Sequence, residues 1–264
     1  MKPVKFKHVM AGMLLAAFAA VAPATAQDAT VQSPAISSQD EQLAVQLSSA
    51  PHLGYVTGPS AAVNGEVRLG LETLVWEMQR RLNPPAGVVA VNIEQDDLTL
   101  LPFIYFPVTA ETQPLSQQAQ RKLQSYIDNN GFLLIDTRDY GAVVNEPRDL
   151  SRILGSLNMR PLVPLPQDHV LMSSFYLVSN VPGTVPGGTV WVEQPGPANG
   201  EVVTSVIIGG RNWAGAWAGT TVAPNSRDRE MAIRAGANMV MHALYGNYKS
   251  DQLHTPAILD RMQP

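Results

Sequence analysis

The charged residues with the most suggestive spacing follow a short apolar segment near the middle of the chain. The segment 132–135 is entirely apolar, and Asp136, Arg138 and Asp139 come directly after it. Two carboxylates and a guanidinium at the end of a strand could bind a polar ligand or serve in acid–base catalysis. In the structural alternative, Asp136 accepts hydrogen bonds from nearby backbone N–H groups, and Arg138 and Asp139 pair on the surface. We favour the structural alternative because such pairs are common.

A histidine next to a carboxylate is the second candidate for chemistry. His169 follows Asp168 and could act as a general base, with Ser173 or Ser174 as the nucleophile. A nucleophilic serine needs a strained turn or a helix terminus to activate it, and the sequence around these two serines predicts neither. We therefore favour packing of His169 against a short turn that Asp168 caps.

A glycine-rich segment with two tryptophans is the third candidate. Residues 209–219 read as a loop that follows an apolar strand, and Arg211 and Asn212 in it could contact a ligand. Trp213 and Trp217 could then form a stacking platform for a sugar or a peptide. Both tryptophans could equally well pack over the edge of the sheet. In either case Trp213 should lie close to the acidic cluster, because both segments leave the sheet.

Several kinds of site are excluded by composition. The chain contains no cysteine, which rules out disulfides, thiolate nucleophiles and Cys-ligated zinc. The histidines beyond the N-terminal leader show no metal-ligand spacing; they are His52, His169, His242 and His254. The phosphate-binding, dinucleotide-binding and serine-elbow motifs are also missing. We expect no metal site and no cofactor.

The N-terminus is typical of a secretory signal peptide. Three lysines precede an uncharged apolar run of about fourteen residues, shorter than the roughly twenty that span a bilayer. A small-x-small site follows, and we expect cleavage after Ala26 and a periplasmic location. Loss of those lysines lowers the basic residues from 18 to 15, against 22 acidic residues. An acidic chain without a basic cluster is an unlikely partner for nucleic acid.

The rest of the chain predicts residues 27–50 as a flexible lead and residues 51–264 as one α/β domain. Apolar strands are expected near 53–57, 88–93, 103–108 and 132–135, and helices near 67–82, 116–128, 147–157 and 226–245, the last ending at Gly246. Alternation of strands and helices indicates a three-layer sandwich around a mostly parallel sheet. Residues 189–193 and 202–208 are expected to pair as an antiparallel addition.

Eight sequence segments spread along the domain carry a family resemblance. They are Leu53 to Gly58, Leu100 to Tyr105, Gly131 to Asp139, Pro166 to Leu171, Ser173 to Leu177, Trp213 to Ala218, Arg229 to Ala232 and Gly246 to Lys249. Between residues 53 and 262 the chain thereby resembles the bacterial domain-of-unknown-function family 4159. The resemblance implies a fold similar to the class I glutamine amidotransferase-like sandwich. In those enzymes a strand leads into a sharp turn with a nucleophilic cysteine, but the comparable turn here, at Asp136 and Thr137, has none.

These observations predict a non-catalytic binding or protein-interaction domain whose partner is an unknown envelope protein or a small polar ligand. The candidate binding residues are Asp136, Arg138, Asp139, His169, Arg211, Asn212 and Trp213. The catalytic alternative is a hydrolase that uses Asp136 or Asp139 with His169. Many relatives carry this domain at the end of a membrane protein, beside a von Willebrand-type segment and near a MoxR-type ATPase. A link to such an assembly is implied by the resemblance alone, since no transmembrane helix is predicted in the mature chain.

Overall fold

The computed structural model describes most of the chain beyond residue 46. The described residues are 47, 49–80, 85, 87–138, 150–155, 157–194, 204–220 and 226–261, with side chains as far as residue 246. The predicted signal peptide, its cleavage site, most of the flexible lead and Asp139 lie outside these residues. Within them, no helix is both long enough and apolar enough to cross a membrane.

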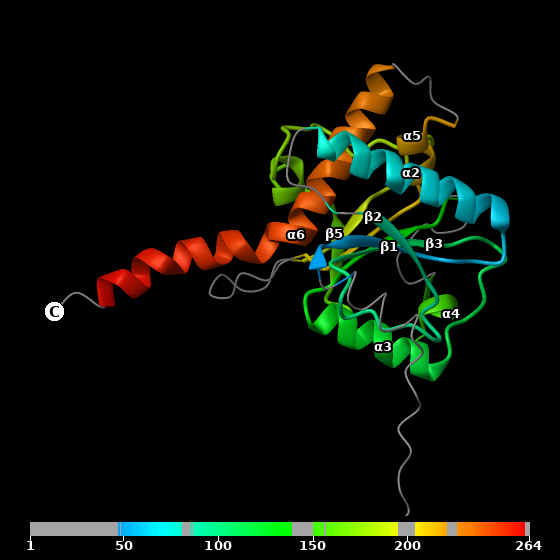
Figure 1. The fold of residues 1–264 in the computed structure, drawn as a ribbon, viewed down its shortest axis with the longest axis horizontal. Helices are drawn as coiled ribbons and strands as arrows, with labels where there is room; N and C mark the ends of the chain where they lie inside the picture. The colour runs from blue at the N-terminus through cyan, green and yellow to red at the C-terminus, as the bar shows by residue number, and fades with distance from the viewer. Residues whose placement is uncertain are drawn as a thin grey trace, which may run out of the picture. The chain divides into compact units, whose positions relative to one another are not determined.

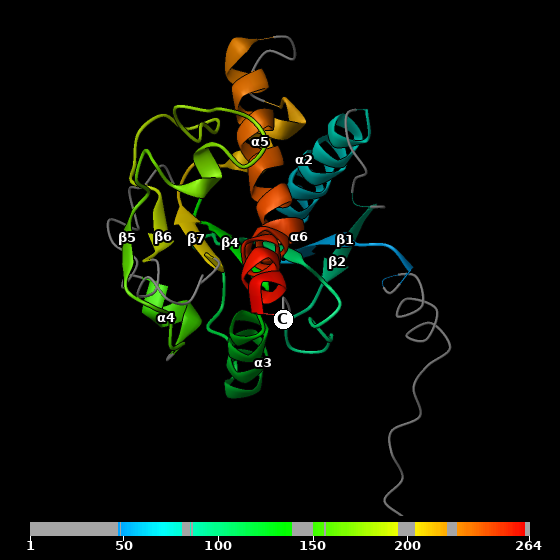
Figure 2. The same cartoon turned by 90° about the vertical axis from the view of Figure 1, so that its left-hand side faces the viewer.

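A mixed sheet of seven strands forms the centre of the fold (Figure 2). The strands are β1 (His52–Val56), β2 (Gly87–Val91), β3 (Phe103–Pro107), β4 (Phe132–Asp136), β5 (Leu162–Pro164), β6 (Trp191–Glu193) and β7 (Val206–Gly209). Their order across the sheet is β2-β1-β3-β4-β7-β6-β5. The first four strands and β7 run parallel, whereas β6 pairs antiparallel with both β7 and β5. The expected mostly parallel sheet with an antiparallel addition is thus confirmed.

Helices cover both faces of the sheet (Figure 1). They are α2 (Ala61–Gln79), α3 (Gln117–Asp128), α4 (Ser151–Leu154), α5 (Trp213–Ala218) and α6 (Arg227–Arg261), with a short 3-10 turn, η2 (Val170–Met172). One apolar core joins α2, α5, α6 and η2 to one face of the sheet. A second core joins α3 and α4 to the opposite face. Two separate apolar interfaces therefore hold the sheet between helical layers.

The strand that precedes the acidic cluster lies in the middle of the sheet. β4 pairs with β3 on one side and with β7 on the other, and all five of its residues are buried. Continuous rather than alternating apolarity is what a strand covered on both faces requires, because successive side chains enter opposite cores. The expectation that residues 132–135 form a central, doubly covered strand is confirmed, and Asp136 is its last residue.

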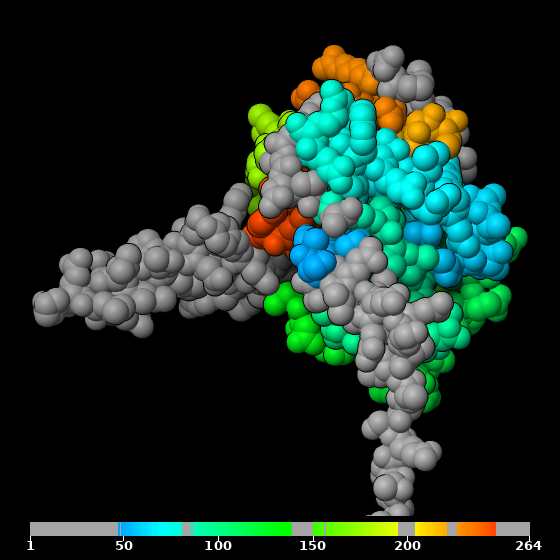
Figure 3. Space-filling view, viewed as in Figure 1, coloured from blue at the N-terminus to red at the C-terminus, as the bar shows by residue number. Residues whose placement is uncertain are grey.

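Side-chain caps fix where α2 and α3 begin. The hydroxyl oxygens of Ser60 and Ser116 accept hydrogen bonds from the backbone N–H groups of Val63 and Ala119, at the first turns of α2 and α3. The helix expected near 116–128 begins at this second cap. α2 buries one stripe of apolar side chains, and the space-filling view shows it lying across this face of the domain (Figure 3).

Two predicted elements differ from the structure. The expected loop at 209–219 contains a helix, α5, which packs so closely on α2 that a Cβ on Gly70 would lie 2.2 Å from the carbonyl oxygen of Ala214. The last helix does not end at Gly246 but continues to Arg261. A glycine inside a helix costs only about 1 kcal/mol, so its presence alone does not end the helix. The helix expected at 147–157 is described only as the single turn of α4.

Candidate functional site

The carboxylate of Asp136 lies fully buried at the carboxyl end of β4 and accepts four hydrogen bonds. Oδ1 accepts from the backbone N–H groups of Arg138 and Asn212, each at 3.0 Å. Oδ2 accepts from the backbone N–H of Trp213 at 2.8 Å and from the hydroxyl of Tyr105. Each carboxylate oxygen therefore has two donors, and no face of the group is open to solvent.

Burial dominates the electrostatics of this carboxylate. Desolvation raises the pKa of Asp136 above its ordinary value, although the hydrogen bonds from Tyr105 and from the three backbone donors act in the opposite direction. Desolvation and the neighbouring Asp136 carboxylate also raise the pKa of Tyr105, so its phenol stays protonated and donates. The same hydroxyl accepts a hydrogen bond from the backbone N–H of Ala214 at 3.3 Å. The two side chains together bind the first turn of α5.

The turn after β4 sends Arg138 across to another layer of the fold. Arg138 has a φ of 54°, a left-handed conformation uncommon for a residue with a side chain. The guanidinium donates to the side-chain oxygen of Asn212 at 2.7 Å and to the carboxylate of Glu66, on α2, at 2.5 Å. Only 14% of the Arg138 side chain and 17% of the Glu66 side chain are exposed. The expected surface pair of Arg138 with Asp139 cannot be described, because Asp139 lies outside the described residues. The acid that pairs with Arg138 in the structure is Glu66.

Glu66 and Asn212 complete the connection between α2 and the segment around α5. The second carboxylate oxygen of Glu66 accepts from the hydroxyl of Thr220 at 2.6 Å. Desolvation acts to raise the pKa of Glu66, but its hydrogen bonds with Thr220 and Arg138 outweigh it and the pKa is lowered. Asn212 has a φ of 48° and caps α5 by accepting from the backbone N–H of Gly215. We call this group of six residues the strand-end network: Glu66, Tyr105, Asp136, Arg138, Asn212 and Thr220.

The two tryptophans belong to the core rather than to a ligand platform. Trp213 and Trp217 are fully buried, and their indole N–H groups donate to the carbonyl oxygens of Val181 and Ala232. Stacking on a ligand needs an exposed ring face, so the packing alternative describes both residues. Trp213 does lie beside Asp136, as expected, but through its backbone N–H. Its assignment as a binding side chain is corrected.

The neighbouring Arg211 points away from this network. Its guanidinium donates to the carbonyl oxygen of Gly188 at 2.7 Å, and burial lowers its pKa. Arg211 therefore anchors the segment before β6, whereas the adjacent Asn212 belongs to the strand-end network. The structure separates these two candidate binding residues.

His169 and Asp136 lie at opposite ends of the strands: His169 is near the amino end of β7, and Asp136 is at the carboxyl end of β4. Its Nδ1 accepts from the backbone N–H of Leu171, so Nε2 carries the proton and donates to the hydroxyl of Thr204 at 3.0 Å. Thr204 precedes β7 by two residues, whereas Asp136 is in register with Gly209 at the other end of that strand. Five residues of extended chain span about 16 Å. The structure therefore does not bring Asp136 and His169 together as the hydrolase alternative requires.

The environment of His169 is that of a neutral, packed histidine. The residue is 8% exposed, and desolvation lowers its pKa, partly offset by the neighbouring Asp168. His242 on α6 contacts the same threonine, with Nε2 3.1 Å from its carbonyl oxygen. Both histidines therefore secure the segment before β7, which agrees with the packing interpretation. The expected cap differs, because His169 rather than Asp168 caps the short turn η2.

An open crevice lies at the carboxyl ends of β1, β2 and β3, next to the strand-end network. It has a volume of about 500 Å³ and is lined by Val56–Pro59 after β1, Asn92–Glu94 after β2, and residues around Pro107 and Glu111–Leu115 after β3. Pro107 is in register with Asp136, and the backbone N–H of Val108 donates to the carbonyl oxygen of Asp136. The crevice and the buried carboxylate are therefore neighbours on one edge of the sheet. The sequence analysis named none of the residues that line it as candidates.

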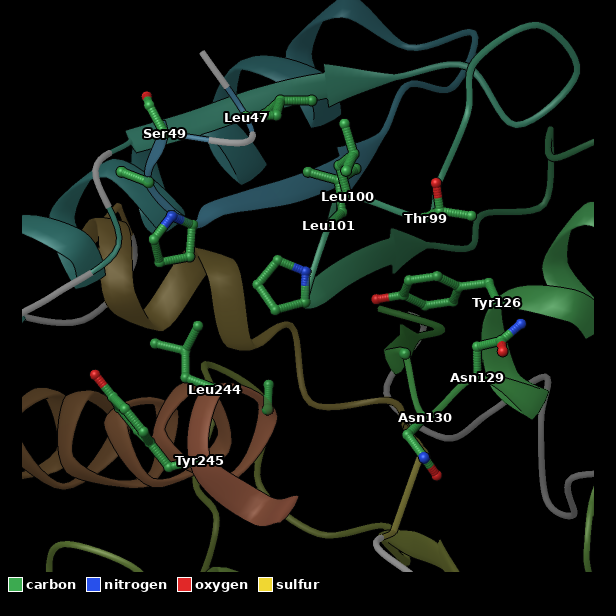
Figure 4. Close-up of a pocket in the computed structure, with 15 residues that line it drawn as sticks. Leu47, Ser49, Thr99, Leu100, Leu101, Tyr126, Asn129, Asn130, Leu244 and Tyr245 are labelled. Carbon is green, nitrogen blue, oxygen red and sulfur yellow. The ribbon is translucent and has the colours of Figure 1, made fainter. Parts of the chain in front are cut away.

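A second, larger groove lies at the amino ends of the same strands (Figure 4). It has a volume of about 790 Å³ and lies between the segment before β3, the end of α3 and the α6 residues Leu244 and Tyr245. The Tyr126 hydroxyl in its wall already donates to the carbonyl oxygen of Phe132. None of the described residues that line it carries a formal charge. We call it the amino-edge groove.

The sequence analysis missed three members of the strand-end network: Glu66, Tyr105 and Thr220. Tyr105 left a usable signal, because a tyrosine inside a fully apolar strand needs a partner for its hydroxyl. Glu66 and Thr220 left none, since their hydrogen bond joins residues 154 positions apart. Within the described residues, no group of three or more potential ligand side chains could hold a metal ion.

Comparison with known proteins identifies a family for this chain. No curated protein matches the sequence. The family model described as "Domain of unknown function (DUF4159)" matches residues 52–244, which include all seven strands and the strand-end network. This chain is a member of the DUF4159 family.

Proposed function

We propose that the chain is an exported, non-catalytic binding or protein-interaction domain on an amidotransferase-like fold. The observation that carries the proposal is the saturated environment of Asp136: four protein donors and no exposed surface. A nucleophile or a general base must reach its substrate directly or through one water molecule. Asp136 has neither route, so the group at the end of the central strand serves the fold.

The turn after β4 supports the comparison with amidotransferase-like enzymes. Those enzymes place a nucleophile at a sharp turn after a strand, and here the chain also turns sharply, with the left-handed residue at Arg138. The side chain that precedes this turn, Asp136, faces inward and binds the first turn of α5. Loss of the nucleophile and its replacement by a structural carboxylate fit a fold that has kept its architecture without its chemistry.

An envelope protein or a small polar ligand is the partner that we propose. The leader that precedes residue 27 supports a periplasmic location, and the acidic balance of the remaining chain argues against nucleic acid. The open crevice beside the strand-end network offers a volume within the range of ordinary ligand pockets.

The test compares catalysis with binding in matched variants. Wild type, Asp136→Asn and the surface control Glu72→Gln are assayed on ester, amide and glycoside substrates and are used to capture envelope proteins. The proposal predicts no hydrolysis that depends on Asp136, together with capture that an excess of free domain competes away. Hydrolysis by the wild type that Asp136→Asn abolishes, while circular dichroism shows an intact fold, would contradict it.

A further inference from the structure

The crevice at β1 and β3 lies where the winding direction of the sheet changes. α2 connects β1 to β2 across one face, and α3 connects β3 to β4 across the other. Because β1 and β3 are neighbours, the loops that follow them diverge and leave space between their carboxyl ends. Ligands of open α/β sheets bind at such a switch point. Cavity and topology therefore indicate the same place independently.

The walls of the crevice are mostly apolar. Val56, Ile93 and Phe106 are buried side chains from the ends of three strands, and Pro59 and Pro114 line the cavity from the loops above them. Apolar walls with a few polar groups are the usual composition of a small-molecule pocket. A ligand that fills this space needs an apolar body.

Among the described residues that line the crevice, the charged ones are both acids, Glu94 and Glu111. The Glu94 carboxylate accepts from the hydroxyl and the backbone N–H of Ser116, and these hydrogen bonds lower its pKa and keep it ionised. The Glu111 carboxylate is exposed and makes no hydrogen bond or ion pair with the described part of the chain. Lys122 donates to the backbone carbonyl oxygens of Glu94 and Asp96 and is not among the described lining residues.

We propose that this crevice binds a ligand with an apolar body and a positively charged amine, such as the N-terminus of an apolar peptide. The inference rests on the proposed binding function and gives it a location and a ligand class. The amine lies against the Glu111 carboxylate, with Glu94 adding to the negative potential, and the apolar body covers the exposed rings of Pro59 and Pro114. Anionic ligands are disfavoured by the same two carboxylates.

Three dipeptide probes that share the same two leucine residues test this assignment by NMR titration of the ¹⁵N-labelled domain. Leucyl-leucinamide carries a positive charge, N-acetyl-leucyl-leucinamide is neutral and N-acetyl-leucyl-leucine is negative. We expect saturable binding of the cationic probe, with shifts at the amides of Thr57, Gly58 and Ile93, and about tenfold weaker binding of the anionic probe. The preference should shrink at high salt, because exposed charges are screened.

A single substitution separates charge from shape. Glu111→Gln should weaken binding of the cationic probe by about two- to fivefold and leave the neutral probe unchanged, as expected for one exposed ion pair. Glu72→Gln, on α2 about 17 Å from the start of that helix, should change neither. Equal affinity for all three probes, shifts confined to the amino-edge groove, or no saturable binding would each overturn the inference. None of these outcomes decides the proposed function, which fails only through Asp136-dependent turnover.

Discussion

The carboxyl ends of the parallel strands form two regions that differ sharply in how they use their polar groups. At the end of β4, every polar atom of the Asp136 side chain is bound by protein and shielded from solvent. At the ends of β1, β2 and β3, an open crevice has an exposed Glu111 carboxylate that makes no hydrogen bond or ion pair with the described residues. The same strand-end position thus carries a closed structural network in one half and an accessible surface in the other.

The difference shows that strand-end acids on one sheet edge need not share a role. Asp136 joins β3, β4 and α5, and Arg138 extends the connection to α2 through Glu66. These contacts add hydrogen bonds and an ion pair to the apolar packing between those layers. In the crevice half, Glu94 joins the loop after β2 to Ser116 at the start of α3, whereas the Glu111 carboxylate has no partner among the described residues. Four predictions can break or sharpen this contrast.

The largest effect should come from Asp136→Ala. Removal of the carboxylate leaves three backbone N–H groups and the Tyr105 hydroxyl without an acceptor in a buried site, and each such group costs about 1–3 kcal/mol. We expect a loss of unfolding free energy above about 4 kcal/mol, measured by urea denaturation. A variant within about 1 kcal/mol of wild type would show that the closed half is not structural.

Arg138→Ala should have a smaller but clear effect. The substitution strands a mostly buried Glu66 carboxylate, and we expect a loss of about 2–3 kcal/mol in thermal and urea unfolding. The matched control is Arg68→Ala, which breaks a pair with Glu72 whose side chains are 60% and 48% exposed and should cost less than about 0.5 kcal/mol. Equal costs for the two variants would remove the distinction between network and surface pairs.

The third prediction uses pH and concerns His169, away from both halves. Its folded pKa is lower than its unfolded pKa, so the unfolded state binds the extra proton first as the pH falls. The stability that this group contributes is fully present above pH about 6.5, the unfolded value, and is lost as the pH falls through the folded value. His169→Gln should flatten this part of the stability profile relative to wild type. An unchanged profile would mean that the histidine is not held neutral.

The smallest effect on stability should come from Glu111→Gln. Its carboxylate is exposed and has no partner in the part of the chain that the structure describes, so we expect a change within about 0.5 kcal/mol in unfolding free energy. A loss comparable to that of Arg138→Ala would show that the crevice also belongs to the structural network.

The sequence was informative where local patterns decide the structure. The apolar run of β4 and the helix near 116–128 depend on residues that are close together in the chain, and both were predicted correctly. The proximity of Trp213 to Asp136 was also expected, from the shared edge of the sheet.

Long-range pairing explains what the sequence could not show. α5 has six residues, includes a glycine and begins after a left-handed Asn212, features that read as a loop. Its first N–H groups are satisfied by Asp136, 77 positions earlier, so the helix depends on a tertiary contact. The partner of Arg138 was likewise beyond local reasoning, because Glu66 lies 72 positions away. The burial of Asp136 follows from these contacts, and this burial is what distinguishes a structural from a catalytic role for the residue.

Binding of leucyl-leucinamide to Asp136→Asn and to Glu111→Gln, measured at a temperature where both are folded, tests the division of this edge most directly. The account predicts that Asp136→Asn is clearly less stable than wild type yet binds the probe with unchanged affinity. It predicts that Glu111→Gln is as stable as wild type and binds two- to fivefold more weakly. Loss of binding in a folded Asp136→Asn, with full binding in Glu111→Gln, would contradict the account.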